Sequence, residues 1–430
     1  MSATAVATSG LRSDTVRDPS IGRRRIKIAS VFTVMAAFLL WFALSMRASY
    51  VQFLLAKYPG PGVPVHTLAT RPTAWVSLAV VVVIGGLAVA DLLARRSVKV
   101  LAMSIAGLAF AISFLVWAYA APNAGFLADP LPGTVSFATP LILGAMSGCL
   151  CERSAVINVA IEGQFLVAAF LASVFASMTQ VGSLGLLGGV IAGIAMAALL
   201  ALFAIKYHVN QVVLGVVLIL LATGLTGFFL DQIPNVGSVT DFLNNPPVLL
   251  PIAIPGLASI PFLGDSFFNQ TILVYIMYAS VAFVTFLIFR TRWGLRVRAV
   301  GEHPTAADTV GIKVNRMRWQ AVLLGGVFAG LGGAFFTVGS AGAFNRGDTG
   351  GNGFIALAAL IMGRWHPIGA TFAALFFGFM ESLALQLGTT GRVPSDLLAM
   401  APYVATIVVV AGFVGRVRPP AADGEPYVKG

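Results

Sequence analysis

The segment between Cys151 and Gln164 places polar side chains between two long apolar runs, where they could handle a polar solute. Asn158 can donate and accept hydrogen bonds, Glu162 can accept them, and Gln164 follows two residues later. Because Asn158 and Glu162 are four residues apart, they would share one face of a helix. Gly163 would allow that helix to break and expose backbone groups toward a cavity. The pattern therefore predicts a substrate pathway or gate in this segment.

The same segment also fits a purely structural role. Glu152 and Arg153 would then lie in a connecting loop, and Glu162 would pair with another group inside the protein. Ionisable residues near membrane depth are costly to bury and are usually retained for function, which favours the pathway over the structural alternative.

A second polar segment, Arg290 to Arg318, reads RTRWGLRVRAVGEHPTAADTVGIKVNRMR and is the most polar stretch after the N-terminus. Pro304 suits the first position of a short helix, and Gly311 suits the position just beyond its end. The helix between them would have about seven residues and a length of roughly 10 Å. A short exposed helix of this kind suits docking into another protein. The alternative is a solvated connector whose arginines only set the membrane topology.

Several kinds of catalytic and metal site are absent from the sequence. The dipeptide Gly-Lys does not occur, which excludes a Walker A phosphate-binding loop, and neither His-Glu-x-x-His nor Gly-x-Ser-x-Gly occurs. The four histidines lie far apart. Cys149 and Cys151 have a spacing that suits neither structural zinc nor a disulfide framework. We therefore expect a chain that is not an enzyme and has no catalytic residue, metal or cofactor of its own.

The elements that position these segments must be membrane-spanning helices. Hydrophobic residues make up 58% of the 430 residues, charged residues only 10%, and the mean hydropathy is +0.91. In a soluble domain, charged residues are roughly a quarter of the total. The composition excludes a soluble enzyme, a disordered chain and a nucleic-acid-binding module. The predicted fold class is all-α, a polytopic transmembrane helical bundle.

Twelve apolar runs mark the candidate spans, most of them near the ~20 residues that cross a bilayer. They are Ile28–Leu44, Thr73–Leu93, Val100–Ala120, Thr134–Leu150, Ala155–Met178, Ser183–Ile205, Gln211–Leu230, Thr271–Phe289, Trp319–Val338, Phe354–Met362, Pro367–Leu385 and Leu397–Val414. The run from Phe354 is short, so it is either a half-helix or a span that ends in a tight turn. Because Glu152–Gln164 and Gly350–Pro367 could be re-entrant or broken helices, the expected number of spans is about 10–12.

The distribution of basic residues sets the predicted orientation. An arrangement of twelve crossings with both termini in the cytoplasm leaves only five of the 27 Lys and Arg residues outside, namely Arg47, Lys57, Arg71, Arg346 and Arg392. Basic residues are retained in cytoplasmic loops, so this bias supports the arrangement and explains the net charge of +11 without a nucleic-acid partner. No convincing cleavage pattern follows the first apolar run, so we expect a retained span rather than a signal peptide.

Glycines recur every four residues on two of the predicted helices, Gly185, Gly189 and Gly193 on one and Gly326 and Gly330 on another. Small residues at this spacing let helix backbones approach each other closely in lipid. Static packing is the favoured interpretation, and a sliding helix interface is the alternative.

Three stretches of the sequence resemble one family. Residues 294–312, GLRVRAVGEHPTAADTVGI, closely resemble the cytoplasmic loop of permease subunits of bacterial nucleoside ABC importers, within the ribose and branched-chain amino-acid class of permeases. Two further motifs of that family resemble residues 138–170, ATPLILGAMSGCLCERSAVINVAIEGQFLVAAF, and residues 350–379, GGNGFIALAALIMGRWHPIGATFAALFFGF. The resemblance runs from Thr134 to Leu385, and Cys149 and Cys151 depart from the small residues and serine expected there.

The resemblance implies a transport subunit that moves nucleosides inward across a bacterial plasma (inner) membrane. ATP and Mg would be bound by a separate cytoplasmic ABC ATPase. A second, related permease and an extracytoplasmic substrate-binding lipoprotein would complete the importer in the membrane lipid. The resemblance also implies a central translocation region near Asn158 and Glu162, with Gln164 beside them. The residues at the implied ATPase contact are Gly301, Glu302, His303, Pro304, Thr305, Ala306, Ala307, Asp308 and Gly311.

The predicted organisation has four parts: a cytoplasmic tail at 1–27, an additional N-terminal transmembrane region at 28–133, the permease core at 134–415 and a cytoplasmic tail at 416–430. Simple sugars or another small polar solute are the alternative cargo. An ion-coupled secondary transporter with Glu162 as its proton or cation site is a less favoured alternative. An intramembrane enzyme would need a convergent acid, base or nucleophile set, and none is visible.

Overall fold

The computed structural model describes residues 19–46, 50–54, 65–90, 96–120, 131–232, 243–260, 263–388 and 418–428, with the single positions 394, 397 and 400. The chain divides into two compact units. The first consists of Met1–Phe53, Val65–Leu127 and Thr390–Arg392, and the second of Leu54–Pro64, Ala128–Thr389 and Val393–Gly430. Each unit is described separately below.

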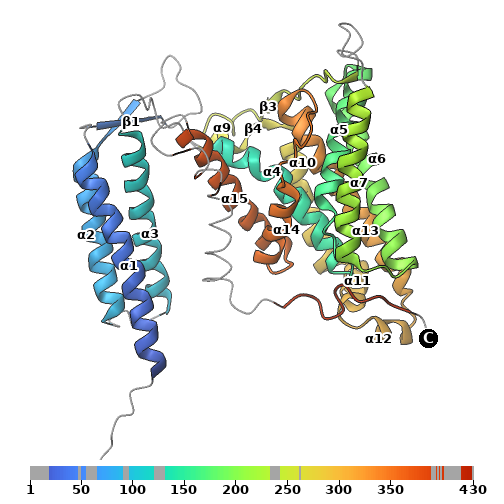
Figure 1. The fold of residues 1–430 in the computed structure, drawn as a ribbon, viewed down its shortest axis with the longest axis horizontal. Helices are drawn as coiled ribbons and strands as arrows, with labels where there is room; N and C mark the ends of the chain where they lie inside the picture. Colours follow the sequence, from blue (N-terminus) through green and yellow to red (C-terminus); the bar gives the residue numbers. More distant parts are fainter. Residues whose placement is uncertain are drawn as a thin grey trace, which may run out of the picture. The chain divides into compact units, whose positions relative to one another are not determined.

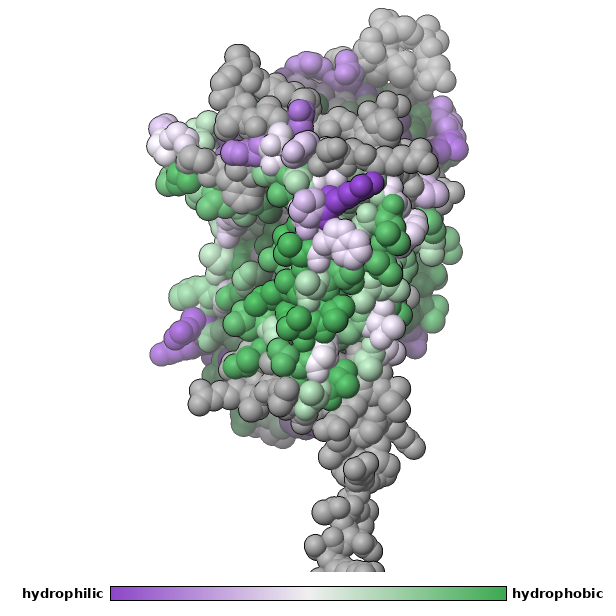
Figure 2. All heavy atoms as spheres, turned by 90° about the vertical axis from the view of Figure 1, so that its left-hand side faces the viewer, coloured by the Kyte–Doolittle hydropathy of each residue, from purple (hydrophilic) through white to green (hydrophobic). Residues whose placement is uncertain are grey.

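The first unit is a bundle of three helices, α1 (Pro19–Ser45), α2 (Thr70–Val89) and α3 (Arg96–Tyr119), with the strands β1 (Tyr50–Leu54) and β2 (Val65–Ala69) paired between α1 and α2. Aromatic packing joins α1 to α3, since the rings of Phe42 and Trp117 stack with centroids 5.0 Å apart. The Trp117 indole N–H also donates to the Ser45 hydroxyl over 2.8 Å. Figure 2 shows that hydrophobic side chains cover the middle of the face on which these helices lie, as a lipid-facing surface requires.

The second unit holds all the remaining elements and is drawn in Figure 1 from green to red. Its elements are α4 (Leu131–Glu152), α5 (Ile161–Thr179), α6 (Gly182–Ala201), η1 (Leu202–Lys206), α7 (Gln211–Gln232), β3 (Pro251–Ala253), α9 (Leu263–Phe267), β4 (Asn269–Thr271), α10 (Ile272–Arg290), α11 (Arg292–Glu302), α12 (Pro304–Thr309), α13 (Val314–Ala334), η2 (Phe335–Ala341), α14 (Asn352–Met362) and α15 (Pro367–Gly388). The strands β3 and β4 form a small antiparallel pair, with Ile252 opposite Gln270.

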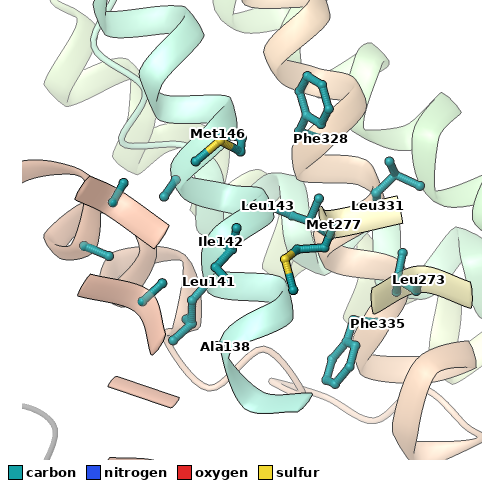
Figure 3. Close-up of a cluster of buried hydrophobic side chains, with 14 of the residues drawn as sticks. Ala138, Leu141, Ile142, Leu143, Met146, Leu273, Met277, Phe328, Leu331 and Phe335 are labelled. Atoms are coloured by element: carbon teal, nitrogen blue, oxygen red, sulfur yellow. The ribbon is translucent and has the colours of Figure 1, made fainter. Parts of the chain in front are cut away.

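Helix α4 forms the centre of the second unit. Its apolar side chains, including Leu141 and Met146, pack against Met277 of α10 and against Leu331 and Phe335 of α13 and η2 (Figure 3). A helix that is apolar all round and buried along most of its length belongs to the core of a bundle rather than to its lipid surface. α4 therefore fixes the positions of the segments that follow it, including the one predicted to form a pathway.

The two glycine stripes predicted from the sequence face each other across α6 and α13. A Cβ atom added to Gly193 would overlap the carbonyl oxygen of Gly326, and one added to Gly330 would overlap that of Gly189. Only glycine permits this approach, and the contact lets the two helices pack backbone to backbone without a hydrophobic driving force between them.

The all-α, polytopic fold class is confirmed. Among the described residues, nine helices are long and apolar enough to cross a membrane, and two shorter apolar helices lie at Ala29–Ser45 and Asn352–Met362. With 11 residues, α14 is about 16 Å long, which is half a bilayer crossing, as expected for a half-helix. The predicted span Leu397–Val414 lies largely outside the described residues, and every other predicted run overlaps a helix.

Candidate functional site

The link between α4 and α5, residues 153–160, is irregular, with five residues buried and Arg153, Ile157 and Val159 half-buried. Val159 packs on Gly215, so the link runs beside the start of α7, which is a candidate membrane span. Non-helical backbone beside a membrane span is tolerated where it is enclosed by protein or lines a polar path.

Asn158 lies in this link, so the prediction that it shares a helical face with Glu162 is wrong. Helix α5 begins only at Ile161. The helix before it ends in a left-handed residue, Ala155, whose φ is +67°. Glycine is the usual residue at such a helix end. Because alanine stands here instead, the sequence does not indicate that the helix ends at this point.

The prediction that Gly163 breaks the helix is also wrong. Gly163 lies inside α5, and the absence of a side chain there matters for packing against α7 rather than for breaking the helix. A Cβ atom there would approach the Leu218 carbonyl oxygen and the Ile219 Cα atom to 3.0 and 3.1 Å. The glycine therefore allows the start of α5 to pack closely against α7.

Asn158 and Gln164 form a buried pair of amides. The Asn158 Nδ2 atom donates to Gln164 Oε1 over 3.1 Å and to the Ser147 hydroxyl over 3.3 Å. Both side chains are fully buried, yet Asn158 Oδ1 and Gln164 Nε2 have no partner among the described residues. Buried polar atoms nearly always find partners, so one free acceptor and one free donor at this place are unusual. The pair can offer both kinds of hydrogen bond to a polar solute.

Glu162 binds the start of α14. Its Oε1 atom accepts from the Thr349 hydroxyl at 2.5 Å and from the Gly351 N–H at 3.0 Å, and its Oε2 atom accepts from the Gly353 N–H at 2.6 Å. A carboxylate at a helix N-terminus is stabilised by the free N–H groups and by the helix dipole. Both oxygens are thus occupied, and the arrangement holds the beginning of the half-helix α14 against the beginning of α5.

The loop before α14 contains the partners of Glu162 that sequence reasoning missed. Gly347, Gly350 and Gly351 all have positive φ angles, so the chain can turn its N–H groups toward one carboxylate. A Cβ atom on Gly353 would overlap the backbone of Glu162. The glycine-rich run from Gly347 to Gly353 was the available signal, because such runs build anion-binding turns at helix starts.

The ends of α4, α14 and α11 meet near Trp365. The Trp365 indole N–H donates to the Glu152 carboxylate, and the Arg153 Nε–H donates to the Trp365 carbonyl oxygen over 3.0 Å. Arg153 also lies 5.7 Å from the centre of the Phe289 ring. A Cβ atom on Gly301 would overlap the Arg153 carbonyl oxygen, so the end of α11 touches the α4–α5 link directly.

Burial changes the pKa of two groups around this junction. It lowers the pKa of the Arg153 guanidinium, with opposing effects from neighbouring groups including Glu302. It also lowers the pKa of His366, and the charge of Arg153 acts in the same direction. Both shifts disfavour additional positive charge at this junction.

The short helix α12 lies where the sequence predicts it. It covers Pro304–Thr309, with Pro304 at its first position and Gly311 beyond its end at a φ of +83°. Glu302, His303, Thr305 and Ala306 are exposed, Asp308 is half-buried, and Ala307 is buried. The preceding helix α11 was not predicted; it forms because the Thr291 hydroxyl accepts from the Gly294 N–H and caps it.

No group of three or more His, Cys, Asp or Glu side chains in the described ranges is arranged to hold a metal ion. Cys149 and Cys151 are buried free thiols. The polar groups at the α4–α5 link and its neighbours are amides, two carboxylates bound by protein donors and a half-buried arginine, which suit hydrogen bonding to a solute and the holding of helix ends.

Comparison with known proteins places the chain in a family. Residues 131–414 match the family described as branched-chain amino acid transport system / permease component. The guanosine ABC transporter permease protein NupQ of Bacillus subtilis (strain 168) is 41% identical over 310 residues, covering 70% of this chain and 96% of that protein. The nucleoside ABC transporter permease protein NupC of Lactococcus lactis subsp. cremoris (strain MG1363) is 39% identical, covering 68% and 94%.

A more distant relative is named for a different substrate, glucose. The glucose ABC transporter permease protein TsgB13 of Haloferax volcanii is 30% identical over 294 residues, covering 65% of this chain and 76% of that protein. No solved structure matches the chain. The matched region includes α4 to α15 and hence every polar segment described above, and the chain belongs to the branched-chain amino acid transport system / permease component family.

Proposed function

We propose that this multi-pass membrane protein is the permease subunit of an ABC importer that moves nucleosides into a bacterial cell. The observation that carries the proposal is the similarity to NupQ and NupC over nearly their whole lengths. The buried amides Asn158 and Gln164 support it, because a nucleoside is neutral and rich in hydroxyls and ring nitrogens. Their place at an irregular link between two candidate membrane spans supports it too, because transporters form solute paths where helices are interrupted.

ATP hydrolysis is assigned to a separate ATPase subunit that binds ATP and Mg. The chain lacks a Walker A loop, so ATP-driven motion must enter it through a protein contact. The candidate contact is α12 with its flanking residues, because it is short, exposed and joined to the α4–α5 link through Gly301 and Arg153. Glu162 is assigned the role of holding α14 and α5 together in the translocation region.

The remaining subunits are assigned by the same reasoning. A second, related permease would complete the membrane part of the importer, and a substrate-binding lipoprotein would deliver the nucleoside from outside. The chain would lie in the plasma membrane with both termini in the cytoplasm.

Uptake measurements test the proposed cargo. In cells that lack other nucleoside uptake, co-expression of this chain with its ATPase, second permease and binding lipoprotein should produce accumulation of labelled guanosine. Unlabelled uridine or adenosine should compete with it, whereas glucose should not. Competition by glucose alone would instead support the sugar alternative suggested by TsgB13. Collapse of the proton gradient at constant ATP should leave uptake intact, and a stop in uptake would favour an ion-coupled transporter.

Reporter fusions test the proposed orientation. A reporter fused after Arg298 should be cytoplasmic, and one fused after Pro247 should be extracytoplasmic, because α10 separates the two positions and basic residues cluster after it. Phosphatase and fluorescent reporters, which are active on opposite sides of the membrane, give the two answers independently. If both fusions report the same side, α10 does not cross the membrane.

A further inference from the structure

The segment 418–428 packs onto the end of the second unit that carries α11 and α12. Figure 1 draws it in dark red, passing along this end of the bundle. A tight turn shapes it, since the Asp423 and Glu425 N–H groups donate to the carbonyl oxygens of Pro420 and Ala422. Ala422 and Tyr427 are only 3% and 8% exposed, so the segment is docked rather than solvated. It lies beyond residue 414, where the match to the family ends.

On one side the segment bonds the end of α11 that leads into α12. The Ala422 N–H donates to the Gly301 carbonyl oxygen over 3.0 Å, and the Ala421 N–H donates to Glu302 Oε2 over 3.2 Å. Burial and the neighbouring Asp308 carboxylate, near the end of α12, raise the pKa of the Tyr427 phenol. The Tyr427 ring packs in one apolar cluster with buried side chains of α11, α12 and α13, namely Val300, Ala307, Val314 and Met317.

On the other side the segment bonds the membrane core. Arg318, in the first turns of α13, is 1% exposed and donates to the Glu425 carbonyl oxygen over 2.9 Å. The groups of opposite charge that act on it are Asp423 and Glu425, both from the segment. His208, between α6 and α7, bonds the Tyr427 carbonyl oxygen over 3.3 Å. Gly424 lies against the side chain of Ile157 in the α4–α5 link.

α12 has few anchors apart from these. It is six residues long, far below the length at which an isolated helix is stable in water, and Ala307 is its only buried residue. Packing of Tyr427 with Ala307, together with the hydrogen bonds to the end of α11 just before α12, therefore supplies much of what holds α12 in one orientation relative to α13 and the α4–α5 link.

We propose that segment 418–428 is a strap that holds α12 against the core, so that movement of α12 is transmitted to the α4–α5 link. Tyr427 is its main positioning residue, because its ring packs with Ala307 of α12 and its carbonyl oxygen bonds His208. This role of the strap rests on the proposed function, because the strap can transmit movement from the ATPase only if α12 is the ATPase contact. It adds a mechanical element outside the region that the family match covers.

The test compares variants of Tyr427 in the complete importer, purified and reconstituted in liposomes with guanosine as the probe. Tyr427→Ala should lower the guanosine transported per ATP hydrolysed by about tenfold, a typical loss of coupling between two sites. Tyr427→Phe keeps the ring in its apolar cluster and removes only the hydroxyl, so it should retain most of the coupling. Val428→Ala, a change at a 68% exposed neighbour, is the matched control and should behave as wild type.

Removal of the whole segment needs a compensating change. Truncation after residue 417 removes the Glu425 carbonyl oxygen that accepts from Arg318 and the carboxylates of Asp423 and Glu425 that act on its charge, and a charge left without partners inside a protein destabilises the fold. Arg318→Met in the truncated chain removes that charge and should restore thermal stability. The coupling ratio of this stable double variant should stay low. A stable double variant that transports normally would overturn the strap.

ATPase binding separates failure of the strap from failure of the proposed function. In the Tyr427→Ala variant the ATPase should still co-purify, because the exposed residues of α12 are unchanged. Loss of the ATPase from this variant would overturn a transmission role and make the segment part of the docking surface. A normal or raised coupling ratio in Tyr427→Ala would overturn the strap and leave α12 as the ATPase contact. If α12 itself is not the contact, disruption of α12 leaves hydrolysis and ATPase binding unchanged.

Discussion

Ala306→Pro is expected to abolish nucleoside uptake while the protein still inserts into the membrane. Ala306 is exposed at the third position of α12, so its side chain is not required for packing. A proline there disfavours the helical conformation of Thr305, and proline within a helix costs up to about 3 kcal/mol. A helix of six residues has too little conformational stability of its own to tolerate a loss of this size. The ATPase contact should therefore be lost when the helix unfolds.

Co-purification of the ATPase and substrate-stimulated ATP hydrolysis measure this effect. Ala306→Ser is the matched control, because it changes the same exposed position without restricting the backbone, and it should retain both properties. Asp308→Ala should weaken docking only in part, since it removes one half-buried carboxylate and leaves the helix formed. Full stimulated hydrolysis in Ala306→Pro would show that α12 is not the coupling element.

Glu162→Ala is expected to be the most damaging single change in the membrane core. It removes the acceptor for the Thr349 hydroxyl and for the N–H groups of Gly351 and Gly353, all at the start of α14. A buried donor left without a partner costs about 1–3 kcal/mol, so three together should cost several kcal/mol. The start of α14 should separate from α5, and uptake should fall to background.

Thermal unfolding in detergent and guanosine uptake measure the two consequences. Glu162→Gln keeps one acceptor oxygen and should lie between wild type and Glu162→Ala in both measurements. Thr179 is exposed at the far end of the same helix, so Thr179→Ala is the control for expression and purification of the variants. It should match wild type in both measurements. A Glu162→Ala protein with unchanged melting and uptake would remove this residue from the translocation region.

Asn158 and Gln164 differ from Glu162 in a way that sequence alone did not indicate. All three were expected to contribute to one substrate path. The carboxylate of Glu162 has both oxygens bound by protein groups, whereas each amide keeps one atom without a partner among the described residues. We therefore propose that the amides contact the solute directly and that Glu162 supports α14.

The helices of this protein and the short helix α12 follow from the sequence by itself. Hydropathy identifies a membrane span without reference to any other part of the chain, because lipid acts on each helix surface separately. α12 is likewise local, since proline starts a helix through its own φ angle and Gly311 ends one by adopting a positive φ. The facing glycines of α6 and α13 were also visible as a pattern, although not as a pair.

Tertiary structure alone decided which groups meet. Glu162 bonds Thr349, 187 residues away, and Arg318 bonds Glu425, 107 residues away. The left-handed residue that follows α4 is Ala155 rather than a glycine. The surrounding fold holds this turn, and no glycine in the sequence indicates it. A hydrogen bond between distant residues depends on how several helices pack at once, and no local pattern of residue types records that arrangement.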